Sequence, residues 1–278
     1  MLGEREADLH SHSIISDGEL SVGLLIKEAE RNNIKYLSIT DHENTYQVDE
    51  ALEILKSNNI NLKIIPGVEI STLYEGEEIH IVAYYNYDMI KELNNLISPL
   101  REQKKVRVEK TLNLLRDIGI EIPYYLISNC RRTVNRMNIA RYIYNNLNFE
   151  SIEEVFKKYF DENPKFKLEP NYPQTDEIVK KLNSIGCIVG IAHPTFLKDW
   201  RKITLVENLI KLGAKGIEVF HPILSENIST SLIKFCQEKN LIPLGGSDFH
   251  GYDTKRKDLG KYNTFTSSAL DIIKILSL

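Results

Sequence analysis

Apolar and polar residues follow two periods along this chain, a period of two that predicts strands and a period near 3.6 that predicts helices. In the first 85 residues, strands are expected at 6–10, 36–40, 62–65, 68–71 and 79–85. One helix is expected from the N-cap Ser21 to Arg31, and a second over Thr45–Ser57. This alternation predicts a parallel sheet that is covered by helices.

The pattern changes from about residue 94 to residue 172, where long charged helices are expected and no comparable strand occurs. The expected helices cover Pro99–Gly119, Asn135–Asn146 and Ser151–Phe160. We therefore predict a helical subdomain, residues 96–172, that is inserted into a domain formed by residues 1–95 and 173–278.

Strand and helix alternate again after the insertion. Helices are expected at 175–185, 205–212, 226–240 and over the last residues, and strands at 187–192, 216–220 and 242–246. About seven such strands favour an α/β barrel, or a distorted one, over an open Rossmann sheet. The sequence has no GxGxxG after its first strand and no P-loop motif.

The composition is that of a globular protein, with 278 residues of which 42% are hydrophobic and 27% charged. No run approaches the ~20 apolar residues that span a bilayer, and the first residues do not resemble a signal peptide. The cysteines Cys130, Cys187 and Cys236 are widely spaced and form no CxxC pair. We expect a cytoplasmic protein without a disulfide framework and without a membrane partner.

The net charge of −4 argues against a protein that coats DNA. The charge is uneven: residues 96–172 hold 14 basic and 10 acidic residues, a balance of +4, which leaves −8 for the rest. An anionic substrate held between the acidic part and arginines such as Arg131, Arg132, Arg136 and Arg141 is one interpretation. A solvated helical surface of mixed charge is the other.

Histidines and carboxylates gather at the ends of the predicted strands. The stretch Asp8-Leu9-His10-Ser11-His12-Ser13 places two imidazoles on the same side of an extended backbone. The whole candidate ligand set is His10, His12, Asp17, His42, Glu69, His80, His193, Asp248 and His250. Nearly all lie at or just past the carboxyl ends of different strands, where barrel enzymes build their sites. His80 is the exception, because it lies near the start of its strand.

Nine donors are too many for one ion and suit two or three. Nitrogen and oxygen donors without thiolates favour Zn, Mn or Fe. Three divalent ions and three carboxylates leave a surplus of about +3, which favours a phosphate group and its hydrolysis by a metal-activated water. A single histidine is more often a hydrogen-bonded core or rim residue than a ligand, but that interpretation does not explain the whole set.

Two further residues stand beside this set. Asp41 is expected to orient the imidazole of a ligand, with general acid–base catalysis as the alternative. His221 ends the predicted strand 216–220, and a structural or a substrate-contacting role is favoured over metal ligation. Both are therefore candidate catalytic-site residues.

The motifs together resemble the PHP (polymerase and histidinol phosphatase) family. The resemblance rests on Asp8–Ser13 with Ser16-Asp17-Gly18, Ile39–His42, Pro66–Glu69, Ala192-His193-Pro194 and Gly246–His250. It implies a distorted (β/α)7 TIM-like barrel with a trinuclear centre of three divalent metal ions, Mn, Fe or Zn. By the family pattern, His10, His12, Glu69 and Asp248 hold one metal, Glu69, His80 and His193 a second, and Asp17, His42 and His250 a third.

Within the family, Glu69–Gly76 followed by Ile79–Val82 is similar to the nucleoside 3′,5′-bisphosphate phosphatase branch. That resemblance implies a phosphatase that removes the 3′-phosphate of small nucleotides such as pAp. Arg136, Arg132 and Asn138 are then the expected phosphate or substrate contacts, although Asn138 stands where the branch has His. The alternatives are a histidinol phosphatase, a 5′→3′ exoribonuclease on short RNA and a metal-stabilised binding module without turnover.

Overall fold

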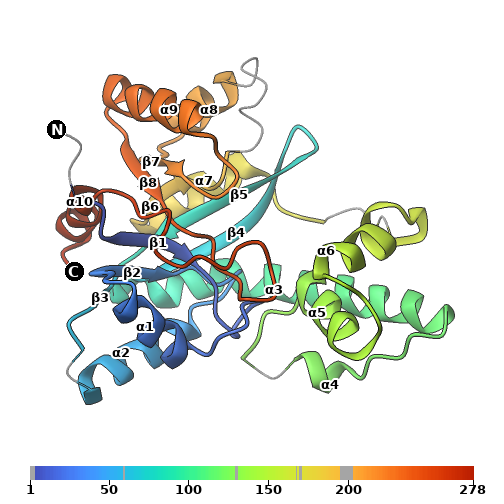
Figure 1. Cartoon of the computed structure of the whole chain (residues 1–278). Coiled ribbons are helices and arrows are strands. Elements are labelled where there is room, and N and C mark those ends of the chain that lie inside the picture. The colour runs from blue at the N-terminus through green and yellow to red at the C-terminus, as the bar shows by residue number, and fades with distance from the viewer. Residues whose placement is uncertain (1–3, 59, 129–130, 167, 169–170, 195–202) are drawn as a thin grey trace.

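The chain folds as eight described strands and a set of covering helices (Figure 1). This computed structural model describes residues 4–58, 60–128, 131–166, 168, 171–194 and 203–278, so Cys130 lies outside the described residues. The strands are β1 (Ala7–Ser11), β2 (Tyr36–Ile39), β3 (Lys63–Ile64), β4 (Gly67–Tyr74), β5 (Glu77–Tyr84), β6 (Ile188–Ile191), β7 (Gly216–Phe220) and β8 (Ile242–Gly245). The α/β class expected from the sequence is confirmed.

The described strands form two sheets, with the orders β1-β2-β3 and β4-β5-β6-β7-β8. The sheets adjoin on two sides, through one bridge between His42 and Glu69 and another between Ser11 and Phe249. Neither junction is a continuous ladder, so no closed barrel is found among the described residues, and the distorted TIM-like barrel expected from the sequence is not confirmed. Both junctions lie among the candidate ligands, which places the candidate site between the two sheets.

The second sheet is mixed, and the expectation of a parallel sheet is wrong for β5. This strand pairs antiparallel with β4 and also with β6. A turn at Glu75 and Gly76, both with positive φ, joins β4 directly to β5 as a hairpin. The start of β5 therefore lies beside the end of β4, where Ser71 is opposite His80. This reversal explains why His80 belongs to the same rim as the other histidines.

Helices cover the outer faces of both sheets (Figure 1). The helices of the described residues are α1 (Val22–Arg31), α2 (Tyr46–Asn58), α3 (Ile90–Asp117), α4 (Tyr124–Ile127), α5 (Arg136–Asn146), α6 (Ile152–Val155), α7 (Thr175–Ile185), α8 (Ile203–Lys211), α9 (Glu226–Lys239) and α10 (Thr266–Leu276), of which α4, α5 and α6 belong to the insertion. Short 3-10 turns lie at Tyr87–Met89 and Pro164–Phe166, and a π-helical turn at Phe156–Asp161 continues α6. No helix of the described residues is both long enough and apolar enough to cross a membrane.

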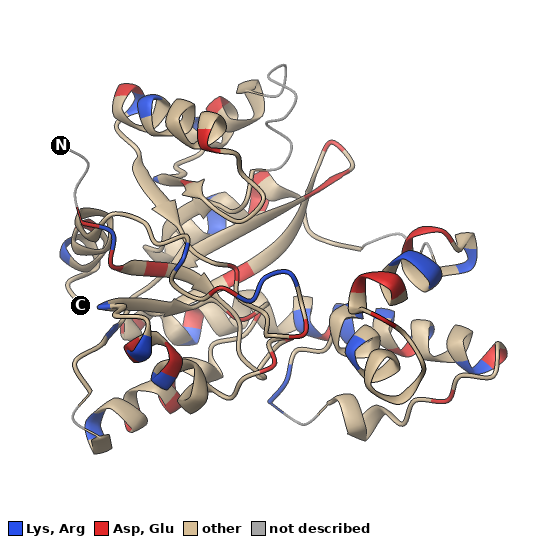
Figure 2. Cartoon of the chain, in the orientation of Figure 1, with Lys and Arg blue, Asp and Glu red and all other residues tan. Residues whose placement is uncertain are grey.

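Helix α3 joins the two sheets to the helical insertion. It begins nine residues before Pro99, the expected start, because Leu93 and Ile97 are buried in the core of the larger sheet. Its second half buries Val108 and Leu115 in a separate core, which the insertion forms from its own residues. The insertion lies to one side of the sheets (Figure 1), and its surface carries basic and acidic residues side by side (Figure 2).

Candidate metal centre

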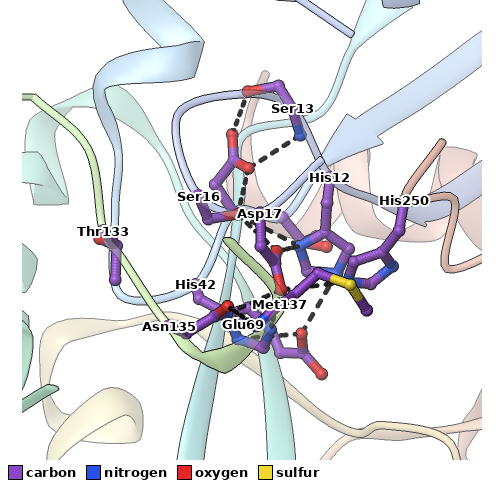
Figure 3. Close-up of polar contacts among 12 residues, drawn as sticks. His12, Ser13, Ser16, Asp17, His42, Glu69, Thr133, Asn135, Met137 and His250 are labelled. Carbon is purple, nitrogen blue, oxygen red and sulfur yellow. Dashed lines mark hydrogen bonds and ion pairs between the residues drawn. The ribbon is translucent and has the colours of Figure 1, made fainter. Parts of the chain in front are cut away.

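All nine candidate ligands come together in the folded chain. Their donor atoms form four overlapping groups, each small enough to surround one ion: His12, Asp17, His42 and His250; His10, His193 and Asp248; His10, His12 and Glu69; His42, Glu69 and His80. Figure 3 shows His12, Asp17, His42 and His250 facing one another, with Glu69 beside them. Side chains from both sheets therefore converge on one buried place.

Glu69 lies at the middle of the candidate centre. Its Oε2 atom is 3.4 Å from His10 Nε2, 3.3 Å from His12 Nε2 and 3.3 Å from His42 Nδ1. Its Oε1 atom is 2.8 Å from His80 Nδ1 and 2.9 Å from His193 Nε2. A carboxylate whose two oxygens face separate sets of imidazoles is placed to bridge two ions.

Asp17 and Asp248 complete the candidate ligand set. Asp17 lies in the loop after β1, and Asp248 lies in the loop after β8. Asp248 Oδ1 lies 3.1 Å from His12 Nε2, and Asp17 Oδ2 lies 3.4 Å from His250 Nε2. Asp248 adopts a positive φ of 48°, in the left-handed region that few residues other than glycine adopt. Gly246 allows this approach, since a Cβ atom there would lie 2.4 Å from the backbone nitrogen of His10.

The donor set fits divalent cations. Asp248 Oδ1 and His42 Nδ1 are buried and have no hydrogen-bond partner, although His12 Nε2 lies 3.1 Å from the first and Glu69 Oε2 lies 3.3 Å from the second. His10 Nε2 and His12 Nε2 point at each other at 3.2 Å. Polar atoms that converge without satisfying one another are the expected arrangement around a shared ion. The centre is therefore able to bind metal.

The pKa values in the centre follow burial and the three carboxylates. Burial opposes the charged form of Glu69, but His42, His10 and His80 outweigh it and hold its pKa well below the usual range. Burial also opposes protonation of His12, whereas its contacts with Asp248 and Glu69 raise its pKa to about 10. Burial also lowers the pKa of His80, but the contacts with carboxylates, Glu69 first among them, outweigh it and raise that pKa to about 9. Burial dominates at His250 and lowers its pKa.

Glu218 is a site residue that the sequence analysis missed. It lies on β7, is fully buried, and its Oε1 atom is 2.6 Å from His10 Nδ1. Its Oε2 atom accepts the backbone N–H of His193 at 2.5 Å. The only signal in the sequence is one acidic residue within an otherwise apolar strand. This fourth carboxylate orients two candidate ligands and reduces the charge surplus of a three-ion centre from +3 to +2, since +6 now faces −4.

His221 contacts a candidate ligand and belongs to none of the four groups of possible metal ligands. The backbone N–H of Ile223 donates to His221 Nδ1 at 3.2 Å, so the ring proton lies on Nε2. Nε2 then donates to Asp248 Oδ2 at 3.1 Å. Arg256 also reaches Asp248 Oδ2, at 2.7 Å. Both side chains hold the orientation of Asp248.

The contacts of Asp41 lie with a loop and not with an imidazole. It accepts hydrogen bonds from Ser13 N at 2.9 Å, from Ser13 Oγ at 2.6 Å and from Ser16 Oγ at 2.5 Å. Burial raises its pKa to about 6. We therefore reassign Asp41 from orienting a ring to shaping the loop between His12 and Asp17.

The three residues expected to contact substrate have different surroundings. Arg136, the first residue of α5, lines the cavity above the centre. Arg132 donates to the carbonyls of Ile14 and Ile127, and Asn138 is buried, accepting from Asn135 N at 2.8 Å and donating to the Ser16 carbonyl at 2.9 Å. The side chains of Arg132 and Asn138 are already hydrogen-bonded to backbone groups, so we no longer expect them to hold substrate.

Comparison with known proteins decides the family. The profile of the PHP domain matches residues 8–169, a stretch that includes the candidate ligands from His10 to His80. The chain belongs to the PHP family. This family comprises metal-dependent phosphoesterases, and the buried histidine and carboxylate groups of this PHP protein are consistent with that chemistry.

The names of two curated relatives of this PHP protein describe activities on RNA and on a nucleoside bisphosphate. It is 30% identical over 251 residues to the 5′-3′ exoribonuclease Rnm of Escherichia coli, which covers 87% of this chain and 84% of the relative. It is 26% identical over 267 residues to a 3′,5′-nucleoside bisphosphate phosphatase of Chromobacterium violaceum, covering 91% and 90%. A solved structure from Bifidobacterium adolescentis has a TM-score of 0.88 over 99% of this chain and 98% of that one, and its 21% identity shows a shared fold.

Proposed function

We propose that this PHP protein is a metal-dependent phosphatase that removes the 3′-phosphate of small nucleoside 3′,5′-bisphosphates. The observation that carries the proposal is a cavity of about 180 Å³ above the metal centre. Its lining includes the candidate ligands Asp17, His42, His80 and His250, the cations Lys104, Arg136 and Arg256, and the carboxylate of Glu78. The named activity of the Chromobacterium violaceum relative supports the same substrate class.

The cations around the cavity differ in how far their charge is available. Lys104 forms an ion pair with Glu43 at 2.5 Å, and Arg256 one with Asp248 at 2.7 Å. Arg136 has no salt bridge with a described residue, but Glu78, which lines the same cavity, interacts with its charge. Arg136 also stands at the N-terminus of α5, where the helix dipole favours anions. Arg136 is therefore the residue best placed to hold the second phosphate of a bisphosphate.

The reacting phosphoryl group would face the candidate ligands at the floor of the cavity. Divalent cations, when bound there, would lower the pKa of water toward ~7 and neutralise charge on the phosphoryl oxygens. The protein supplies the geometry: Glu69 spaces the two sets of imidazoles, while Glu218 and His221 fix His10 and Asp248. No nucleophilic side chain is required.

A second candidate function is 5′→3′ release of nucleotides from short RNA. Two lining residues of the cavity, Lys104 and Tyr172, also line a neighbouring groove, so a second space lies beside the cavity. The 5′-3′ exoribonuclease of Escherichia coli is a relative of this chain over most of its length.

A substrate panel tests the assignment. Metal-loaded protein is assayed with pAp, p-nitrophenyl phosphate, histidinol phosphate and 5′-phosphorylated short RNA. We expect pAp to have a much higher kcat/KM than p-nitrophenyl phosphate, and Arg136→Gln to raise KM for pAp more than for the monophosphate, with exposed Arg116→Gln as the control. If pAp is no better than p-nitrophenyl phosphate, the assignment is wrong.

The remaining outcomes separate the alternatives. Preference for histidinol phosphate would indicate a histidinol phosphatase, and mononucleotide release from RNA with the highest kcat/KM would indicate the exoribonuclease. A binding module predicts no hydrolysis of any ester by the metal-loaded protein, while His10→Ala lowers thermal stability.

A further inference from the structure

The helical insertion contributes apolar side chains to the cavity above the metal centre. Met137, on the first turn of α5, and Phe156, where α6 passes into the π-helical turn, both line this cavity. Tyr172, the last residue of the predicted insertion, lines it as well. Figure 3 shows Met137 extending toward the candidate ligands. These three residues form an apolar wall in a cavity whose other lining residues are mostly charged or polar.

We propose that the base of the substrate nucleotide stacks on Phe156, and that this ring sets the preference of the site for nucleoside phosphates over phosphate esters without a base. The inference rests on the proposed phosphatase function and adds a specificity-determining residue to the same site. It requires a ring that is partly uncovered at the cavity, that is held in place, and that shares the cavity with phosphate-binding groups.

Phe156 differs from its neighbours in the core of the insertion. Val155, Tyr159 and Phe160 are buried in that core, whereas Phe156 packs against it and is only partly buried. Because Phe156 also lines the cavity, part of its surface is open to a ligand there. A phenylalanine that only fills the core would be covered in the same way as its neighbours.

Contacts within the insertion hold the ring of Phe156 in place. Its centroid lies 5.2 Å from that of Phe160, at an interplanar angle of 55°. The backbone N–H of Glu162 donates to the Lys157 carbonyl at 3.0 Å, a hydrogen bond across five residues that marks the π-helical turn. Such turns are frequent at functional sites. A ring that is already fixed loses little conformational entropy when a base stacks on it.

The apolar wall shares its cavity with the residue that is expected to hold a phosphate. Met137 directly follows Arg136 at the start of α5, and both side chains line the cavity. Phosphate-binding groups beside an aromatic ring are the composition expected for a ligand that has phosphates and a flat apolar part. The thioether of Met137 is flexible and polarisable, so it adapts to bases of different size. A phosphate ester without a base would leave this wall uncovered.

The test compares pAp with ribose 3,5-bisphosphate, which has the same phosphates but no base. The ratio of kcat/KM for pAp to kcat/KM for ribose 3,5-bisphosphate is measured for each variant of the metal-loaded, full-length protein. We expect this ratio to fall about tenfold in Phe156→Ala, because the stacking of a base on an aromatic ring is lost. Phe156→Tyr keeps the ring and should retain the ratio of the wild type.

Phe149→Ala is the matched control. Phe149 is also a partly buried phenylalanine that packs against the core of the insertion, with its ring centroid 5.9 Å from that of Tyr159. It is not among the described residues that line the cavity. Both alanine variants should lower the melting temperature, and only Phe156→Ala should lower the ratio.

The outcomes separate this inference from the proposed function. If the wild type hydrolyses both compounds with equal kcat/KM, or if the two alanine variants change the ratio equally, the role of Phe156 is overturned and the phosphatase proposal stands. If neither compound is hydrolysed, the proposed function fails, and calorimetry then compares the binding of pAp to the wild type and to Phe156→Ala. Weaker binding by the variant would support stacking on Phe156, whereas equal or absent binding would overturn it.

Discussion

Single carboxylates decide how the histidines of this PHP protein are arranged. Glu69 separates them into two sets through its two oxygens, and Glu218 holds His10 from the opposite side of the ring. Because Glu218 bonds to His10 Nδ1, the Nε2 atom of that ring is left to face the centre. The contact with Glu218 restricts the His10 ring, and we expect it to strengthen any metal bond that His10 Nε2 makes.

We predict that Glu218→Gln lowers metal affinity by about 10–100-fold without unfolding the chain. The amide keeps the volume of the side chain but loses the charge that faces His10 Nδ1 at 2.6 Å. A competition titration with a metal indicator measures the affinity, and circular dichroism checks the fold. Equal affinities of the variant and the wild type would contradict a role for Glu218 in orienting His10.

Among the elements, α5 ties the insertion to the metal centre. Three polar side chains, at positions 135, 138 and 141, lie along one side of this helix and contact the loop that carries Asp17. The Arg141 guanidinium donates to the carbonyls of Asp17 at 2.7 Å and His250 at 3.0 Å, and it pairs with Asp253 at 2.6 Å. One partly buried guanidinium thus holds the loops of two candidate ligands.

We predict that Arg141→Gln reduces the metal bound per chain by one ion relative to the wild type. The loss should fall on the group that contains Asp17 and His250, because those two loops lose their shared donor. Metal content after gel filtration, measured by mass spectrometry, is the readout. Asp253→Asn leaves both carbonyl contacts in place and should retain more metal, so equal losses in both variants would contradict the explanation.

On the scale of the whole molecule, folding gathers histidines and carboxylates in one place. Protonation of these side chains opposes metal binding. The pKa values of about 10 for His12 and about 9 for His80 mean that both rings carry a proton near neutral pH in the metal-free protein. Ligation requires the neutral imidazole, so protons and metal compete for the same nitrogen atoms. The carboxylates that raise these pKa values also attract the metal.

We therefore predict that metal binding at about pH 7 releases protons and strengthens as the pH rises toward about 9. Titration calorimetry in buffers of different ionisation enthalpy measures the release. Since both pKa values exceed the unfolded value, the stabilisation of the metal-free fold by these two rings is complete below about pH 6.5 and is lost as the pH rises through 9 to 10. Absence of proton release would contradict the prediction.

The sequence by itself determined which residues gather and what chemistry they share. The positions of histidine and acidic residues, nearly all at or just past the carboxyl ends of apolar strands, identified the nine candidate ligands that the fold brings together, because these strand ends meet at one rim. The same periodicity predicted helix α7 with its bounds and the helical character of the insertion. These features are local, so a single sequence contains them.

Only the tertiary structure decided the features that depend on pairing between distant segments. The antiparallel direction of β5 brings His80 to the rim, and the packing of β7 brings Glu218 against His10, 208 residues away in the chain. Likewise, Arg141 donates hydrogen bonds to the loops at Asp17 and His250 only in the folded chain, and the sequence of its own helix did not predict these contacts. The role of each of these residues depends on which strand or loop packs against it. A local pattern of polar and apolar residues does not predict that packing.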